Sequence, residues 1–136
     1  MPTRFYCPST GAAAVSPAFD TAWENTGSAT RLATSTSKIS SAMTTVTIVD
    51  DSELDADLLY RQYVSAPING QTIAAQTIEF QIRAREVTAG SNLFTAIGLR
   101  VVSNDGSSVT GTLLAVTRDG LEVTTDVTHI NRRLTA

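Results

Sequence analysis

The stretch Ile78-Glu79-Phe80-Gln81-Ile82-Arg83-Ala84-Arg85 alternates apolar and polar residues without a break. In an extended strand this alternation places the four apolar residues on one face and the four polar residues on the other. Two further strand candidates follow, from Phe94 to Ser103 and from Val109 to Arg118. Asn104-Asp105-Gly106 lies between them and is the strongest turn signal in the chain. These features predict an antiparallel sheet with one buried face.

More strand candidates lie on both sides of this sheet. Arg4 to Cys7, Ala42 to Val49 and Leu58 to Ser65 precede it. After it, Asp119-Gly120 predicts a second hairpin turn that leads into a last strand from Leu121 to Thr128. With about six to eight strands, no long helix and no repeat, the sequence predicts an all-β fold, an antiparallel β-sandwich that is jelly-roll-like.

Length and composition indicate one folded domain. The 136 residues are enough for a single β-sandwich domain over 1–136, and a hydrophobic content of 42% is too high for a disordered chain. Charged residues make up 17%, below the value of about a quarter in typical domains, and Thr, Ser and Ala take their place. A surface with so little charge suits a protein that is covered by neighbours in an assembly.

Residues 1–17 form an extended N-terminal arm in this prediction. The segment is rich in small residues, and Pro8 and Pro17 cannot donate hydrogen bonds to a sheet. Two placements of the arm remain open, across a neighbouring subunit or on its own sandwich. Residues predicted to contact a partner are four aromatic residues near the arm and two arginines near the C-terminus: Phe5, Tyr6, Phe19, Trp23, Arg132 and Arg133.

The acidic stretch from Asp50 to Asp57 has two interpretations. Carboxylates at such spacing chelate calcium in some loops. The EF-hand pattern, however, requires Gly at the sixth position and Glu at the twelfth, where this sequence has Asp55 and Arg61. The residues therefore favour a solvated acidic loop, and we predict no metal and no cofactor.

Catalytic and nucleic-acid-binding patterns are missing from the sequence. His129 is the single histidine and Cys7 the single cysteine, which excludes an intramolecular disulfide and makes a transition-metal site improbable. No nucleophile elbow or phosphate-binding loop occurs, so we predict that the chain is not an enzyme. A net charge of −3 argues against nucleic acid. The absence of a signal peptide and of a long apolar run predicts synthesis in the cytoplasm without membrane insertion.

Several segments resemble predicted virion proteins of tailed bacteriophages, a β-rich and poorly characterised family. The resemblance spans nearly the whole chain, and these segments carry it: Arg4-Phe5-Tyr6, Pro8-Ser9-Thr10-Gly11, Val15-Ser16-Pro17-Ala18-Phe19, Trp23-Glu24, Ser40 to Thr45, Arg61 to Ser65 with Pro67, Arg100 to Gly106, Gly111 to Leu114 and Asn131-Arg132-Arg133. It implies a structural component of a phage particle. Family members tend to run on past the last of these segments, which implies an edge strand that needs a partner strand.

The resulting functional prediction is a capsid decoration protein that binds other virion subunits and forms a homo-oligomer within the virion. One alternative is a structural protein of the tail or neck. Another is a carbohydrate-binding β-sandwich, for which Tyr60, Tyr63 and Trp23 would supply the rings that stack on sugars.

Overall fold

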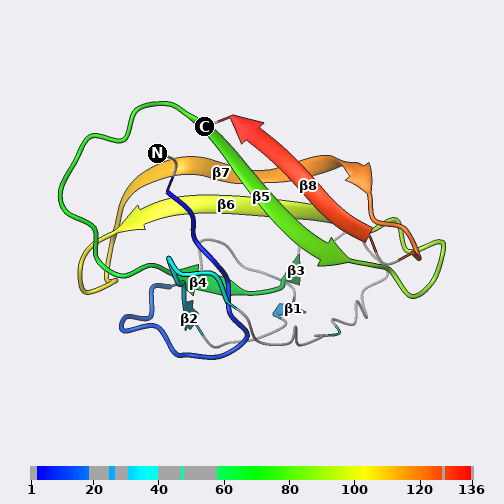
Figure 1. The fold of residues 1–136 in the computed structure, drawn as a ribbon, viewed down its shortest axis with the longest axis horizontal. Coiled ribbons are helices and arrows are strands. Elements are labelled where there is room, and N and C mark those ends of the chain that lie inside the picture. Colours follow the sequence, from blue (N-terminus) through cyan, green and yellow to red (C-terminus); the bar gives the residue numbers. More distant parts are fainter. Residues whose placement is uncertain are drawn as a thin grey trace. The chain divides into compact units, whose positions relative to one another are not determined.

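The computed structural model describes residues 3–18, 25–26, 31–39, 47, 58–126 and 128–135, with the side chains of 25–26 and 128–135 left out. These residues are β-rich and contain no helix, and the strands pair two by two. The chain divides into two compact units (Figure 1). The first comprises Met1–Gly70 and Ser103–Ser108, and the second comprises Gln71–Val102 and Val109–Ala136. The predicted all-β class is thus confirmed at the level of a β-rich chain.

The first unit is built around the short strand β2 (Arg31–Ala33). It pairs in parallel with β4 (Gln62–Val64). Antiparallel bridges join Tyr6 to Ser35 and Ala12 to Leu32, so that β2 lies between β4 and the N-terminal segment. A second parallel pair consists of β1 (Asn25–Thr26) and β3 (Leu58–Leu59). Leu32 is the buried hydrophobic side chain described in this unit.

The second unit is one long two-stranded ribbon that bends back on itself. β5 (Thr77–Ala84) pairs antiparallel with β8 (Thr128–Thr135), and β6 (Phe94–Val102) pairs antiparallel with β7 (Val109–Glu122). The β6–β7 hairpin is therefore nested within the β5–β8 pair. At the bend, Glu86 N–H donates to the carbonyl of Thr124 (3.1 Å) and Val123 N–H donates to that of Leu93 (2.8 Å). In Figure 1 the β5–β8 pair crosses the β6–β7 pair diagonally.

The alternation of β5 predicted from the sequence is confirmed. Thr77, Glu79, Gln81 and Arg83 are exposed, whereas the residues between them are half-buried. A strand with a period of two has this pattern when one face packs and the other meets water. The predicted buried face is therefore present along the whole strand, although its side chains are half-buried rather than fully enclosed.

The hairpin turn predicted at Asn104-Asp105-Gly106 is also confirmed, and serine side chains stabilise it. The Ser103 hydroxyl donates to Asp105 Oδ1 (2.6 Å), and the backbone N–H and the hydroxyl of Ser107 donate to the same oxygen at 3.0 and 2.9 Å. Gly106 is buried with φ +74°, a left-handed conformation that L residues rarely adopt. The turn is thus held by its own side chains and requires glycine at Gly106.

The second predicted hairpin turn, at Asp119-Gly120, is wrong. β7 continues through these residues to Glu122, and the last strand is β8 rather than Leu121 to Thr128. β7 has 14 residues opposite the 9 of β6, and four register shifts absorb the difference. Asp119-Gly120 lies in the first shift, between the pairs Phe94–Glu122 and Ala96–Arg118. Glycine within a strand often marks such a bulge, where the pairing is locally interrupted.

A further bulge explains the glycine in β6. Between the pairs Ile97–Thr117 and Leu99–Leu114, β7 advances by one residue more than β6. Val116 belongs to the bulged part of β7, and its Cγ2 would lie 3.1 Å from a Cβ added at Gly98. A side chain at Gly98 would therefore crowd the valine that the bulge directs toward it.

One further predicted strand is divided in two, and two predicted segments lie outside the described residues. The single strand expected from Leu58 to Ser65 is interrupted at Tyr60-Arg61 and becomes β3 and β4. The strand expected from Ala42 to Val49 and the acidic stretch from Asp50 to Asp57 lie outside the described residues, apart from Thr47.

Candidate functional site

Four of the six predicted interface residues lie in described parts of the chain. Tyr6 is half-buried and exchanges two backbone hydrogen bonds with Ser35 (2.7 and 2.9 Å), while Phe5 beside it is 48% exposed. Arg132 and Arg133 belong to β8 of the second unit, in register with Phe80 and Glu79. Phe19 and Trp23 lie outside the described residues.

The described part of the predicted arm is fixed to its own chain. Backbone hydrogen bonds join Ala13 to Arg31 and Ala33 to Gly11 at 2.8 Å each. Two arginines add side-chain bonds to the carbonyls of the segment, Arg31 Nε to Pro17 (3.0 Å) and Arg61 Nη1 to Ser9 (3.3 Å). Of the two placements left open by the sequence, these residues show the one on the protein's own sheet.

Arg61 also lies in a small polar and aromatic cluster that the sequence analysis did not identify. Its guanidinium carbon is 5.6 Å from the centroid of the Tyr60 ring. Burial raises the pKa of the Tyr63 hydroxyl, nearby Cys7 and Tyr60 raise it further, and Arg61 lowers it in part. Cys7 is exposed, yet partial desolvation by its neighbours also raises the pKa of its thiol. Both groups are therefore protonated at neutral pH, a state that does not suit a nucleophile.

Arg61 Nε in this cluster is buried and has no hydrogen-bond partner among the described residues. The sequence could not predict this cluster, because Cys7 and residues 60–63 are far apart in the chain. They come together because the N-terminal segment and β4 both pair with the segment that contains β2. The hydrogen bond from Arg61 to the Ser9 carbonyl connects the N-terminal segment to this cluster.

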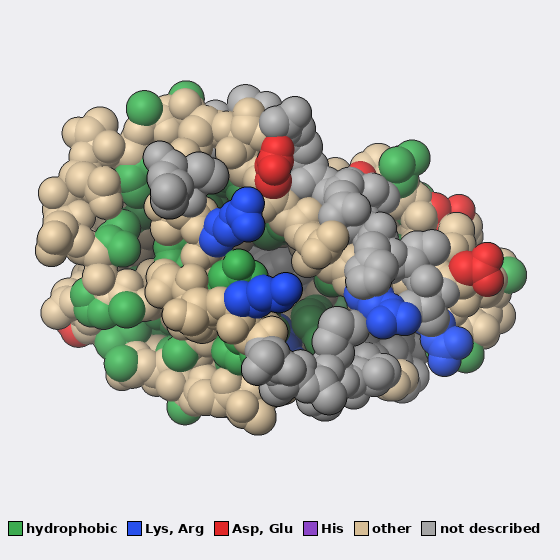
Figure 2. All heavy atoms as spheres, in the orientation of Figure 1, with side chains coloured by type: hydrophobic (Ala, Val, Ile, Leu, Met, Phe, Trp, Pro, Cys, Tyr) green, Lys and Arg blue, Asp and Glu red, His purple; other side chains and the backbone are tan. Residues whose placement is uncertain are grey.

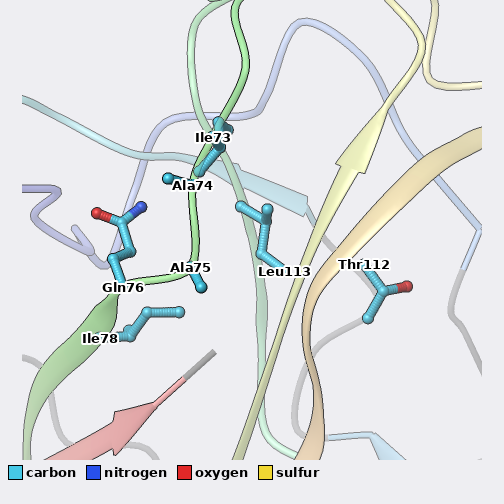
Figure 3. A pocket seen from close by; sticks show the side chains of 7 residues that line it. All are labelled: Ile73, Ala74, Ala75, Gln76, Ile78, Thr112 and Leu113. Atoms are coloured by element: carbon cyan, nitrogen blue, oxygen red, sulfur yellow. The ribbon is translucent and has the colours of Figure 1, made fainter.

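A small pocket of about 180 Å³ lies in the second unit. Figure 3 shows it between the segment that leads into β5 and the strand β7, with Ile73, Ile78 and Leu113 among its apolar side chains. The remaining lining residues are Ala74, Ala75, Gln76 and Thr112. Ligand pockets for small molecules usually enclose about 300 Å³ or more and carry some orienting polar groups. This pocket is smaller, and no titratable side chain lines it.

Other sites in the described part of the chain also fail to suggest a ligand. These residues contain no group of three His, Cys, Asp or Glu side chains placed to hold a metal ion. A carbohydrate site would need exposed aromatic rings on which sugars can stack. Tyr60 is 37% exposed and Tyr63 is half-buried, so these two tyrosines do not supply two fully exposed rings. The described part of the chain contains no helix long and apolar enough to span a membrane.

Several large apolar side chains are exposed in the described residues. Among the described residues the buried hydrophobic side chains are Leu32, Leu114 and Val123. Large hydrophobic residues with at least 37% of their surface exposed are more numerous: Phe5, Tyr60, Ile68, Val87, Leu93, Leu99, Val109, Val116 and Leu121. On the face shown in Figure 2, hydrophobic side chains are scattered among backbone and uncharged polar atoms, and the charged side chains form small separate groups. Scattered apolar side chains are common on protein surfaces, and burying these against another molecule would be favourable.

No protein-family model, curated protein sequence or solved structure gives a match to this chain. The resemblance to phage virion proteins therefore remains a prediction from the sequence. What the structure contributes to function is the exposed apolar side chains and the two-stranded pairing of the second unit.

Proposed function

We propose that the chain is a non-enzymatic structural subunit that binds other protein subunits of a bacteriophage particle. One observation supports this role above the others. In the described residues, exposed large hydrophobic side chains outnumber buried hydrophobic ones. Covering apolar surface yields roughly 25 cal/mol for each Å², so subunit contacts would supply stabilisation that the isolated chain lacks.

The charge and the strand arrangement are consistent with assembly. A net charge of −3 and a charged content of 17% produce little long-range repulsion between copies packed side by side. The ribbon of the second unit is two-stranded throughout, and such a ribbon gains independent stability when further strands or a packed layer are added. A neighbouring subunit would provide either of these.

The position within the particle follows from the resemblance noted in the sequence. Capsid decoration is the role we propose, with a structural role in the tail or neck as its alternative. In either position the apolar surface faces neighbouring virion proteins, and the N-terminal segment stabilises the subunit itself through its pairing with β2.

The test is to locate the protein in particles purified from the culture that carries its gene. Immunogold labelling is expected to decorate heads, and labelling restricted to tails would support the alternative. Val87→Asp places a charge at a side chain that is 82% exposed and should lower the number of copies per particle. Thr125→Asp, at an exposed polar residue, is the control and should leave that number unchanged. Particles without the protein would overturn the proposal.

A further inference from the structure

One strand of the ribbon, β5, has an edge that is both regular and open in the described part of the chain. β5 pairs along one edge with β8 through eight consecutive residue pairs without a register shift, and the sheet contains these two strands. The β6–β7 pair, by contrast, has four register shifts. Bulges twist an edge and hinder the addition of another strand, whereas a regular edge exposes a row of N–H and C=O groups.

The sequence of β5 is complementary to itself when a second copy runs antiparallel to it. Placing Gln81 opposite Gln81 of the second copy brings unlike charges together and pairs apolar residues with apolar residues. The opposed pairs on either side of this axis are then Glu79–Arg83, Phe80–Ile82 and Ile78–Ala84, each occurring twice. Because each pair is formed in both directions, the arrangement is a two-fold symmetric interface.

The exposure pattern of β5 agrees with this register. Glu79, Gln81 and Arg83 are exposed, and the intervening residues are half-buried. In this register the exposed face of one copy therefore continues into the exposed face of the other, and the half-buried face continues into the half-buried face. A shift by one residue would place exposed polar residues opposite half-buried apolar ones. A shift by two residues, which centres Ile82, preserves the faces and opposes Glu79 to Arg85, but leaves Arg83 opposite the uncharged Gln81.

The other strands of the unit are less suited to pairing with themselves. The sequence of β8 contains His129, Arg132 and Arg133 and no acidic residue. Antiparallel pairing of two copies of β8 would therefore bring basic residues together without a carboxylate. β6 has Arg100 as its one charged residue, and β7 is interrupted by the shifts described above.

We propose that two copies of the chain pair antiparallel through β5 around a two-fold axis at Gln81, which joins the two ribbons into a four-stranded sheet in the order β8–β5–β5–β8. This inference rests on the proposed assembly role and identifies a second copy as the partner at this edge. Glu79 already has a partner within its own chain, and a carboxylate has enough acceptor sites to bind Arg83 of the second copy in addition. Addition of the strands also relieves the marginal stability of a two-stranded ribbon.

Charge reversal tests the proposed register. The dissociation constant of the dimer is measured by sedimentation for the unaltered chain and for Arg83→Glu, Glu79→Arg and the double variant, with circular dichroism to monitor folding. Arg83→Glu turns two opposite-charge pairs into two like-charge pairs and should weaken the dimer about tenfold or more. The double variant restores opposite charges and should recover the dimer. Recovery with Glu79→Arg/Arg85→Glu in its place would show the shifted register and overturn the axis at Gln81.

Cross-linking tests the axis directly. In a Cys7→Ser background, Gln81→Cys places two thiols opposite each other, at a separation that suits a disulfide in paired strands. Mild oxidation should therefore yield a covalent dimer. Thr77→Cys is the matched control on the same exposed face, because residue 77 of the two copies would lie about 27 Å apart.

Two results would overturn the inference: a monomer at all concentrations, or a dimer unaffected by Arg83→Glu and not cross-linked through residue 81. Neither would remove the protein from phage particles, so failure of the dimer is distinguishable from failure of the proposed function. Conversely, a β5 dimer that is absent from particles would retain the interface and refute the virion role.

Discussion

Replacing Gly106 with alanine should destabilise the hairpin turn for two separate reasons. The residue has φ +74°, and an L side chain in the left-handed region costs roughly 1–2 kcal/mol. The added Cβ would also lie 3.2 Å from Val15 Cβ and 3.3 Å from Val15 Cγ2, closer than ordinary contact. Together these effects predict a loss of about 2 kcal/mol in the free energy of unfolding. For a chain of this size that loss lowers Tm by about 8 °C.

Thermal unfolding followed by circular dichroism measures this change, and two glycines serve as controls. Gly11 has φ +97° but no atom near its added Cβ, so Gly11→Ala should cost only the backbone strain, about 1 kcal/mol. Gly90 has neither a left-handed conformation nor a close neighbour, and Gly90→Ala should leave Tm unchanged or slightly raised. If Gly106→Ala and Gly90→Ala melted at the same temperature, the argued turn conformation and its packing on Val15 would be wrong.

Three further predictions concern other parts of the fold. Gly98→Ala should cost about 1 kcal/mol by crowding Val116, and adding Val116→Ala should restore most of that loss in urea unfolding. Hydrogen bonds from Ser103 and Ser107 lower the pKa of Asp105 from 3.8 to about 2. Its contribution to stability is therefore complete above about pH 4 and is lost as the pH falls toward 2, and Asp105→Asn should reduce that dependence. NMR titration should also show a higher pKa for Asp105 in Ser103→Ala. Because partial desolvation raises the pKa of the exposed Cys7, iodoacetamide should alkylate it more slowly in the folded than in the unfolded chain at pH 8, as measured by mass spectrometry. Equal rates would contradict this.

Local patterns predicted the parts of the fold that depend on neighbouring residues. The alternation in β5 and the turn at Asn104-Asp105-Gly106 are properties of short segments, and both are present in the structure. Asp119-Gly120 shows the limit of such patterns. The same dipeptide is compatible with a tight turn or with a bulge, and the choice depends on whether β6 continues opposite it.

Pairings between distant segments were not accessible from the sequence. The pairing of β5 with β8 skips the whole β6–β7 hairpin, and no local signal specifies it. The same applies to the bridges between the N-terminal segment and β2, which decide that the described part of the predicted arm packs on its own chain. The cluster around Arg61 depends on these bridges, so it too was missed.

The nested pairing of the ribbon has a consequence for how the chain folds. The innermost pair, Val102–Val109, closes a short loop, and each pair further out closes a loop that its inner neighbour has already shortened. Zipping outward from the Ser103–Ser108 turn thus avoids the large entropic cost of joining Thr77 to Thr135 in one step. During synthesis, however, β5 leaves the ribosome before β8, so the edge of β5 that pairs with β8 is unpaired until β8 emerges. Before β8 emerges, β5 of another nascent chain can pair with this strand in place of β8. How often this happens depends on the rate of translation relative to the rate at which β5 and β8 of one chain pair.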